Sequence, residues 1–132
     1  MKERNVVIYA RESNHAGANE SLARQKDELR AFCEKNGYVV TDEVATIGNR
    51  QDSMYALKEA VERAKNTEDK TLFMASTNRV VGTRDELIEV EELIKNAGVS
   101  IATMDGEYER VRKYGVTGSS LIAATLVATE GE

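Results

Sequence analysis

The run Val6-Val7-Ile8-Tyr9-Ala10-Arg11-Glu12-Ser13 decides the fold of this chain. Three consecutive β-branched residues followed by a tyrosine form a short apolar run, which is typical of a strand covered on both faces. Residues i and i+2 of a strand point to the same side, so Arg11 and Ser13 would share one space if the strand continues that far. In open α/β sheets the ligand crevice lies at the carboxyl ends of the strands, and this pair stands at such an end.

Apolar strand patterns alternate with helical patterns along the rest of the chain. We expect strands at residues 38–44, 71–75 and 99–103, and helices over residues 21–36, 54–64 and 83–97. A further helix, apolar nearly all round, is expected from about residue 117 and would pack against the core or another chain. This order predicts an α/β fold with a mostly parallel sheet and helices on both faces.

Local signals mark the ends of the expected helices. Gly37 and Gly98 follow the first and third helices and should stop them. Asp52 or Ser53 is expected to cap the second helix. The segment Thr83-Arg84-Asp85-Glu86 matches a capping box at the start of the third.

Composition indicates a globular domain of ordinary size. The chain has 132 residues, of which 41% are hydrophobic and 31% charged. No apolar run approaches the roughly 20 residues that span a bilayer, so no membrane partner is expected. The amino terminus leads straight into a strand without a signal-peptide core. The single cysteine, Cys33, excludes an internal disulfide and fits a reducing cytoplasm.

The formal net charge of −5 argues, taken alone, against a nucleic-acid partner. The distribution of charge carries more weight than the sum, because many carboxylates fall on the outer sides of the expected helices. Arginines instead fall near the ends of the expected elements, at Arg11, Arg24, Arg50, Arg79 and Arg84.

Polar side chains follow three of the expected strands. Arg11 and Ser13 follow the first strand, Arg50 the second, and Asn78 and Arg79 the third. Parallel topology brings these loops to one edge of the sheet. Guanidinium groups match phosphate oxygens in bidentate geometry and stabilise the charge of a phosphoryl transition state. The residues therefore favour a serine nucleophile that attacks a phosphodiester.

Other interpretations of these residues stay open on spacing alone. Arg11 and Ser13 also fit a strand-end arginine paired with a carboxylate and a serine in a turn. Gln25 fits a solvated helix position, and Arg79 fits a surface charge. His15 beside Ser13 suggests a Ser–His hydrolase, although the Gly-x-Ser-x-Gly turn of such enzymes is absent.

Metal and nucleotide sites are not expected in this chain. One histidine and one cysteine cannot form a usual metal cluster. Neither a GxGxxG loop nor a Walker A motif occurs. Cys33, on an apolar helical face, is expected to be a small core residue.

Two motifs resemble the opening of the serine recombinase catalytic domain, the family of resolvases, invertases and serine integrases. That opening reads Tyr-x-Arg-x-Ser, a short loop, then Ser-Leu-x-x-Gln. The corresponding segments here are Tyr9-Ala10-Arg11-Glu12-Ser13 and Ser21-Leu22-Ala23-Arg24-Gln25. Residues 72–80 resemble the family's apolar strand ending in Asp-Arg-Leu, and residues 86–99 and 121–130 resemble its later helices.

The resemblance covers essentially the whole chain and implies a resolvase-like fold of three layers. It implies that residues 1–132 form the catalytic domain, without the family's C-terminal DNA-binding region. It also implies DNA as the partner, with strand exchange inside a homodimer or tetramer that assembles through the last helix. No metal or cofactor is required by such a reaction.

The resemblance further implies a role for each matching residue. Ser13 would attack the scissile phosphate and form a phosphoserine bond to the 5′ end of the DNA. Arg11 and Arg79 would bind and polarise that phosphate. The residues expected to bind substrate or to support the site are Tyr9, Gln25, Asn78, Arg50 and Arg84.

The sequence departs from the family pattern at three positions. Asn78 replaces an aspartate, while Gly82 and Ser53 each stand where the family has an arginine. Arg50 and Arg84 lie close to the missing arginines. These departures leave two alternatives: a degenerate, non-catalytic recombinase fold kept for oligomerisation or regulation, and a small phosphate binder or phosphohydrolase.

Overall fold

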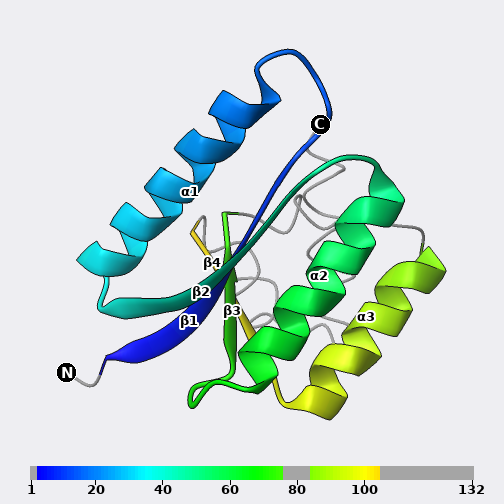
Figure 1. Cartoon of the computed structure of the whole chain (residues 1–132). Coiled ribbons are helices and arrows are strands. Elements are labelled where there is room, and N and C mark those ends of the chain that lie inside the picture. The colour runs from blue at the N-terminus through cyan, green and yellow to red at the C-terminus, as the bar shows by residue number, and fades with distance from the viewer. Residues whose placement is uncertain (1–2, 76–83, 105–132) are drawn as a thin grey trace.

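Parallel strands and three helices build the structure, a computed structural model that describes residues 3–75 and 84–104 (Figure 1). The strands are β1 (Arg4–Glu12), β2 (Tyr38–Ile47), β3 (Thr71–Met74) and β4 (Ser100–Thr103). The helices are α1 (Ala18–Lys35), α2 (Arg50–Lys65) and α3 (Arg84–Ala97). Strands and helices alternate as the apolar patterns predicted.

The sheet has the order β2-β1-β3-β4, and every pairing between these strands is parallel. At the carboxyl end, Arg11 pairs with Thr46 and Glu12 with Ile47 in β2. Met74 and Thr103 likewise pair at the ends of β3 and β4. The carboxyl ends of all four strands therefore meet at one edge, as expected for the loops that carry the candidate site.

β1 is an inner strand, covered on both faces. Its residues 6–10 are at most 1% exposed. On one face, α2 and α3 pack over a core that includes Val7, Tyr9, Leu57 and Leu72. This burial confirms the prediction made from the apolar run, because an unbroken apolar strand needs a cover on each side.

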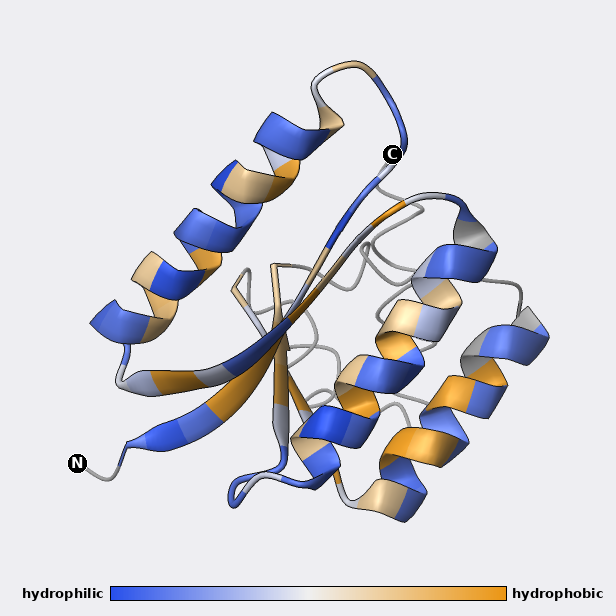
Figure 2. Ribbon diagram, in the orientation of Figure 1, coloured by the Kyte–Doolittle hydropathy of each residue, from blue (hydrophilic) through white to orange (hydrophobic). Residues whose placement is uncertain are grey.

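On the other face of the sheet, α1 is the helix that packs among the described residues. Leu29 and Cys33 of this helix are fully buried against the core that includes Ile8 and Phe73. Cys33 is thus a core residue, as predicted, and burial raises the pKa of its thiol to about 11. Figure 2 shows the resulting pattern, with apolar residues along the central strands and mixed polarity along each helix.

α1 begins three residues earlier than the sequence pattern indicated, at Ala18 rather than at residue 21. Gly17 adopts a left-handed conformation with φ of 85°, and the amide of Ala18 donates a hydrogen bond to the carbonyl of His15. This tight turn brings the chain into the helix early, and Glu20 in the first turn interacts favourably with the helix dipole. The loop after Ser13 is therefore short.

β2 and α2 also extend beyond their expected bounds. β2 continues to Ile47, and α2 begins at Arg50. The prediction that Asp52 or Ser53 caps α2 is wrong, because the side chain of Asn49 accepts a hydrogen bond from the amide of Asp52. The polar composition of this segment suggested a loop. The end of an edge strand and the first turn of a helix are also polar, because both are exposed to solvent as a loop is.

The glycine stops are confirmed. Gly37 follows the C-cap of α1 with φ of 79°, and Gly98 follows α3 with φ of 70°. Both conformations disfavour residues that carry a Cβ atom. The capping residue Thr83 and the expected helix from residue 117 lie outside the described residues.

Candidate active site

Ser13 is the first residue after β1 and is exposed at the carboxyl edge of the sheet. The strand ends at Glu12, so the side of the sheet on which Ser13 lies does not follow from strand alternation. Its exposure nevertheless leaves it accessible to a large substrate.

Arg11 is half-buried on the α2 side of the same strand end. Its Nε donates a hydrogen bond to the hydroxyl of Ser53 at 2.6 Å. Its Nη2 donates to the carbonyl of Gly48 at 3.4 Å. Gly48 lies in the turn between β2 and α2 and Ser53 lies in the first turn of α2, so the second crossover of the fold orients a side chain of the first strand.

Gln25 holds the backbone of Arg11 from the opposite side of the sheet. The amide of Arg11 donates to Gln25 Oε1 at 3.2 Å, and Gln25 Nε2 donates to the carbonyl of Arg11 at 3.0 Å. The Gln25 side chain is buried, at 7% exposure. The alternative of a solvated helix residue is therefore wrong for Gln25, which lies under the strand end.

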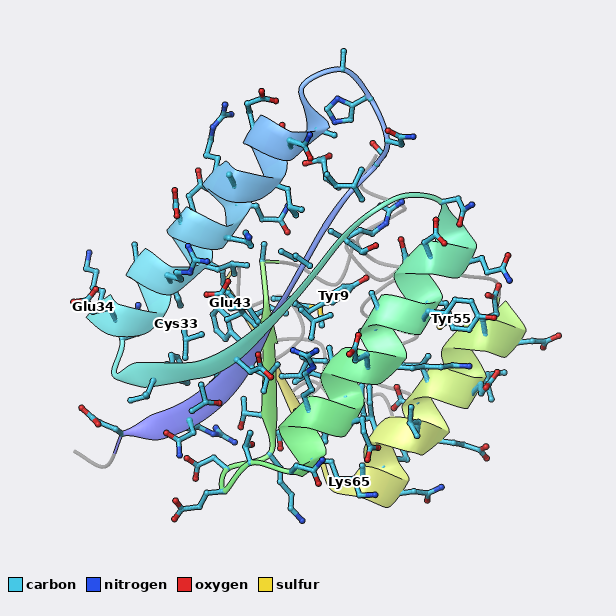
Figure 3. All side chains as sticks on the ribbon, viewed as in Figure 1. Tyr9, Cys33, Glu34, Glu43, Tyr55 and Lys65 are labelled. Atoms are coloured by element: carbon cyan, nitrogen blue, oxygen red, sulfur yellow. The ribbon has the colours of Figure 1, made fainter. Side chains whose placement is uncertain are left out.

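Tyr9 lies beneath this arrangement, on the side of the sheet covered by α2 (Figure 3). Its hydroxyl donates to the carbonyl of Ser53 at 3.2 Å. Burial raises the pKa of Tyr9 to about 12, against the opposing effect of the Arg11 charge. The tyrosine is therefore neutral at physiological pH and fixes the first turn of α2.

His15 contacts groups other than Ser13 in the described residues. Its Nδ1 donates to the carbonyl of Ala16 at 2.8 Å, and its Nε2 lies 3.4 Å from a carboxylate oxygen of Glu12. The hydrogen bond to Ala16 and the nearby Glu12 raise the pKa of His15. A raised pKa and a partner other than Ser13 give no support to a Ser–His hydrolase, whose histidine must act as a base.

The other predicted site residues come from the same edge of the sheet. Asn78 and Arg79 lie outside the described residues, in the connection between β3 and α3. Arg50 and Arg84 are the first residues of α2 and α3, and their side chains lie outside the described part. The fold thus brings the starts of both helices to the edge where Ser13 lies.

Ser53 and Gly48 are functional candidates that the sequence did not single out for this role. Ser53 is 1% exposed, and its sequence position indicated only a helix cap and the replacement of a family arginine. A Cβ atom on Gly48 would lie 2.6 Å from a carboxylate oxygen of Asp52 and 3.1 Å from its Cβ atom, so a larger residue there would force the Asp52 side chain to shift. The helix-start pattern of Asn49 and Asp52 was the signal that could have located this turn.

The described residues show neither a metal-binding cluster nor a membrane-spanning helix. No group of three or more histidine, cysteine or acidic side chains in residues 3–75 and 84–104 is arranged so that it could hold a metal ion. In the same ranges, none of the helices has the length and hydrophobicity to cross a bilayer.

The fold and the site define a class: an α/β domain in which a held arginine and an exposed serine stand two residues apart at the carboxyl edge of a parallel sheet. Residues 6–126 match the family described as Resolvase, N terminal domain. The chain belongs to this family, and it is a catalytic domain of the serine site-specific DNA recombinases. No match was found among curated proteins.

Solved structures share the fold at low sequence identity. The C-terminal catalytic domain of ISC1926 TnpA, an IS607-like serine recombinase, is 20% identical, with a TM-score of 0.58 and coverage of 97% of this chain and 99% of that one. The N-terminal catalytic domain of TP901-1 integrase is 20% identical, with a TM-score of 0.63 and coverage of 96% and 95%. A resolvase family site-specific recombinase from Streptococcus pneumoniae is 16% identical, with a TM-score of 0.63 and coverage of 97% and 87%.

These findings confirm the resemblance, the resolvase-like fold and the recombinase function that the two opening motifs implied. Nothing in the fold or the comparisons favours a degenerate, non-catalytic module.

Proposed function

We propose that Ser13 is the nucleophile of the recombination reaction. Its hydroxyl oxygen attacks the scissile phosphorus and forms a phosphodiester bond to the 5′ end of the DNA. The serine hydroxyl gives up its proton, the bond from phosphorus to the 3′ oxygen breaks, and that oxygen takes up a proton. Attack by a 3′ hydroxyl on the phosphoserine reverses the step, so the energy of the broken bond is kept for rejoining.

The observation that supports this proposal is the fixed arginine that stands two residues before the exposed serine at the same strand end. Gln25 holds the Arg11 backbone by two hydrogen bonds, and Ser53 and Gly48 accept from its guanidinium. A charge held in place before the substrate arrives stabilises a phosphoryl transition state without reorganisation. Arg11 would thus bind the phosphate that Ser13 attacks.

The remaining predicted residues complete the proposal. Arg79 is the second phosphate-binding arginine, with Asn78, Arg50 and Arg84 as further substrate contacts. Tyr9, which we expected to bind substrate, is fully buried. We therefore assign it a supporting role through its hydrogen bond to the Ser53 carbonyl.

Trapping of the covalent intermediate tests the nucleophile. The full-length recombinase is incubated with a suicide DNA substrate, and the protein–DNA adduct is measured by denaturing electrophoresis. Ser13→Ala should abolish the adduct, and Arg11→Lys should lower its rate by about 100-fold, because a point charge replaces a bidentate donor. Ser100→Ala, at the opposite edge of the sheet, is the matched control and should react normally. Undiminished adduct in Ser13→Ala would rule out the proposal.

We also propose that the chain self-associates through the apolar segment at residues 121–128. Family membership implies a DNA substrate and oligomeric assembly in general, and the apolar sequence of this segment supports its use as the interface. Sedimentation velocity over a range of concentrations should show association that Leu126→Glu weakens. A strict monomer at the highest concentration, or association unchanged by Leu126→Glu, would contradict this interface.

A further inference from the structure

We infer that Ser53 is a positioning residue of the reaction, whose hydroxyl sets the direction of the Arg11 guanidinium. The inference rests on the proposed role of Arg11 as a phosphate ligand. The two residues are 42 positions apart in the sequence, and their contact is the shortest hydrogen bond that Arg11 makes among those described.

The direction of each hydrogen bond at Ser53 follows from its partners. The hydroxyl lies 2.9 Å from the carbonyl of Asn49, which can only accept. Its single proton therefore points to Asn49. Arginine has no acceptor, so Arg11 Nε donates to a lone pair of the same oxygen at 2.6 Å. The Ser53 hydroxyl thus donates to the Asn49 carbonyl and accepts from the positively charged Arg11 guanidinium.

The backbone of Ser53 is fixed as firmly as its side chain. Its amide donates to the Asn49 carbonyl at 3.0 Å, and its own carbonyl accepts from the Tyr9 hydroxyl at 3.2 Å. The residue is 1% exposed. A hydroxyl anchored by α2 and by the core strand cannot follow a moving guanidinium, so the guanidinium must adapt to the hydroxyl.

The contacts also fix the plane of the guanidinium. Nε and Nη2 form the side edge of the fork, and they donate to Ser53 in the first turn of α2 and to Gly48 in the turn before it. Loss of the Ser53 acceptor would let the plane rotate and the charge shift from the phosphate.

The test compares adduct formation by the full-length wild-type recombinase with that of Ser53→Ala and Ser53→Thr under single-turnover conditions. Ser53→Ala should lower the rate of adduct formation by about 10- to 100-fold, the effect of a small misplacement of a catalytic group. Its affinity for uncleaved DNA should change by less than about threefold. Ser53→Thr keeps the hydroxyl and should restore most of the rate.

A double-mutant cycle separates positioning from general structural damage. In an Arg11→Lys background, which has no Nε fork, Ser53→Ala should cause little further loss of rate. Thr67→Ala removes a matched hydroxyl after the far end of α2, where Thr67 donates to the Ala64 carbonyl, and should leave the rate unchanged. Should Ser53→Ala fail to fold, Ser53→Cys, of similar size but a weak acceptor, replaces it with the same expectation.

Two results would overturn the inference. One is a Ser53→Ala rate within about twofold of wild type, and the other is an equal loss in the wild-type and Arg11→Lys backgrounds. Either result leaves the proposed function intact as long as Ser13→Ala abolishes the adduct. Failure of the Ser13 experiment would instead remove the basis of both.

Discussion

At the scale of single residues, the site is built by placing oxygen atoms around one guanidinium. Arg11 is half-buried, and the removal of a charge from water is costly unless hydrogen bonds replace the lost hydration. The Ser53 hydroxyl and the Gly48 carbonyl accept from its side chain, while Gln25 engages its backbone. The protein itself therefore orients the arginine side chain and its backbone.

The two hydrogen bonds of Gln25 should contribute measurably to stability. Gln25→Leu leaves the amide and the carbonyl of Arg11 without these partners in a part-buried position, which costs about 1–3 kcal/mol per unsatisfied group. Urea denaturation should show the lower free energy of unfolding. Gln51→Leu, at an exposed position of α2, is the control and should change it by less than about 0.5 kcal/mol. Equal stability of the two variants would show that the two hydrogen bonds between Gln25 and the Arg11 backbone contribute nothing to the free energy of unfolding.

At the scale of elements, the turn between β2 and α2 links helix capping to the site. Asn49 caps α2 through its side chain and accepts from Ser53 through its carbonyl. Asp52 in the first turn adds a favourable charge at the helix N-terminus. The turn before α2 and the first turn of the helix therefore supply the two acceptors for the Arg11 side chain, Gly48 and Ser53.

Mutation can separate the two roles of Asn49, the helix cap made by its side chain and the acceptor for Ser53 provided by its carbonyl. Asn49→Ala removes the cap and should lower the free energy of unfolding by about 1 kcal/mol in a urea titration. Asn19→Ala, an exposed asparagine in the first turn of α1, is the control and should be neutral or slightly stabilising. Because the Asn49 carbonyl remains, adduct formation should fall less than in Ser53→Ala. A larger fall than in Ser53→Ala would contradict this separation.

At the scale of the whole molecule, the sheet separates two hydrophobic cores, one on each face. The phenol of Tyr9 in β1 is buried in the core under α2 and α3. Tyr9 is 0% exposed, and its pKa of about 12 stands above the usual value of 10. The exposed ion pairs that flank β2, such as Arg30 with Glu43 and Arg63 with Asp42, contribute little by comparison, because solvent screens them.

The raised pKa of Tyr9 predicts a loss of stability in alkali. Between about pH 10 and 12 the unfolded chain releases the phenolic proton while the folded chain keeps it, so stability falls as pH rises. Below pH 10 the stabilisation from the protonated Tyr9 is fully present, and a rise in pKa from 10 to about 12 corresponds to about 2–3 kcal/mol. In urea titrations from pH 8 to 12, Tyr9→Phe should show a shallower decline than wild type. Parallel declines would contradict a buried, protonated Tyr9.

Much of the fold follows from local pattern. The apolar run at residues 6–10 indicated a doubly covered strand, and Gly37 and Gly98 marked two helix ends because their left-handed conformations suit glycine. The early start of α1 and the extension of β2 escaped prediction. In both places the decisive signal was a turn conformation or an exposed edge, and hydrophobic periodicity does not report either.

The sequence alone determined the order of elements, the burial of β1 and the position of Arg11 and Ser13 at a strand end, together with the family motifs around them. Only the tertiary structure decided that Gln25 and Ser53, 14 and 42 positions from Arg11, hold that arginine. The physical reason is that periodicity reports which side of an element is apolar. Which polar atoms meet across elements depends on sheet register and helix packing, and these form only when the chain folds.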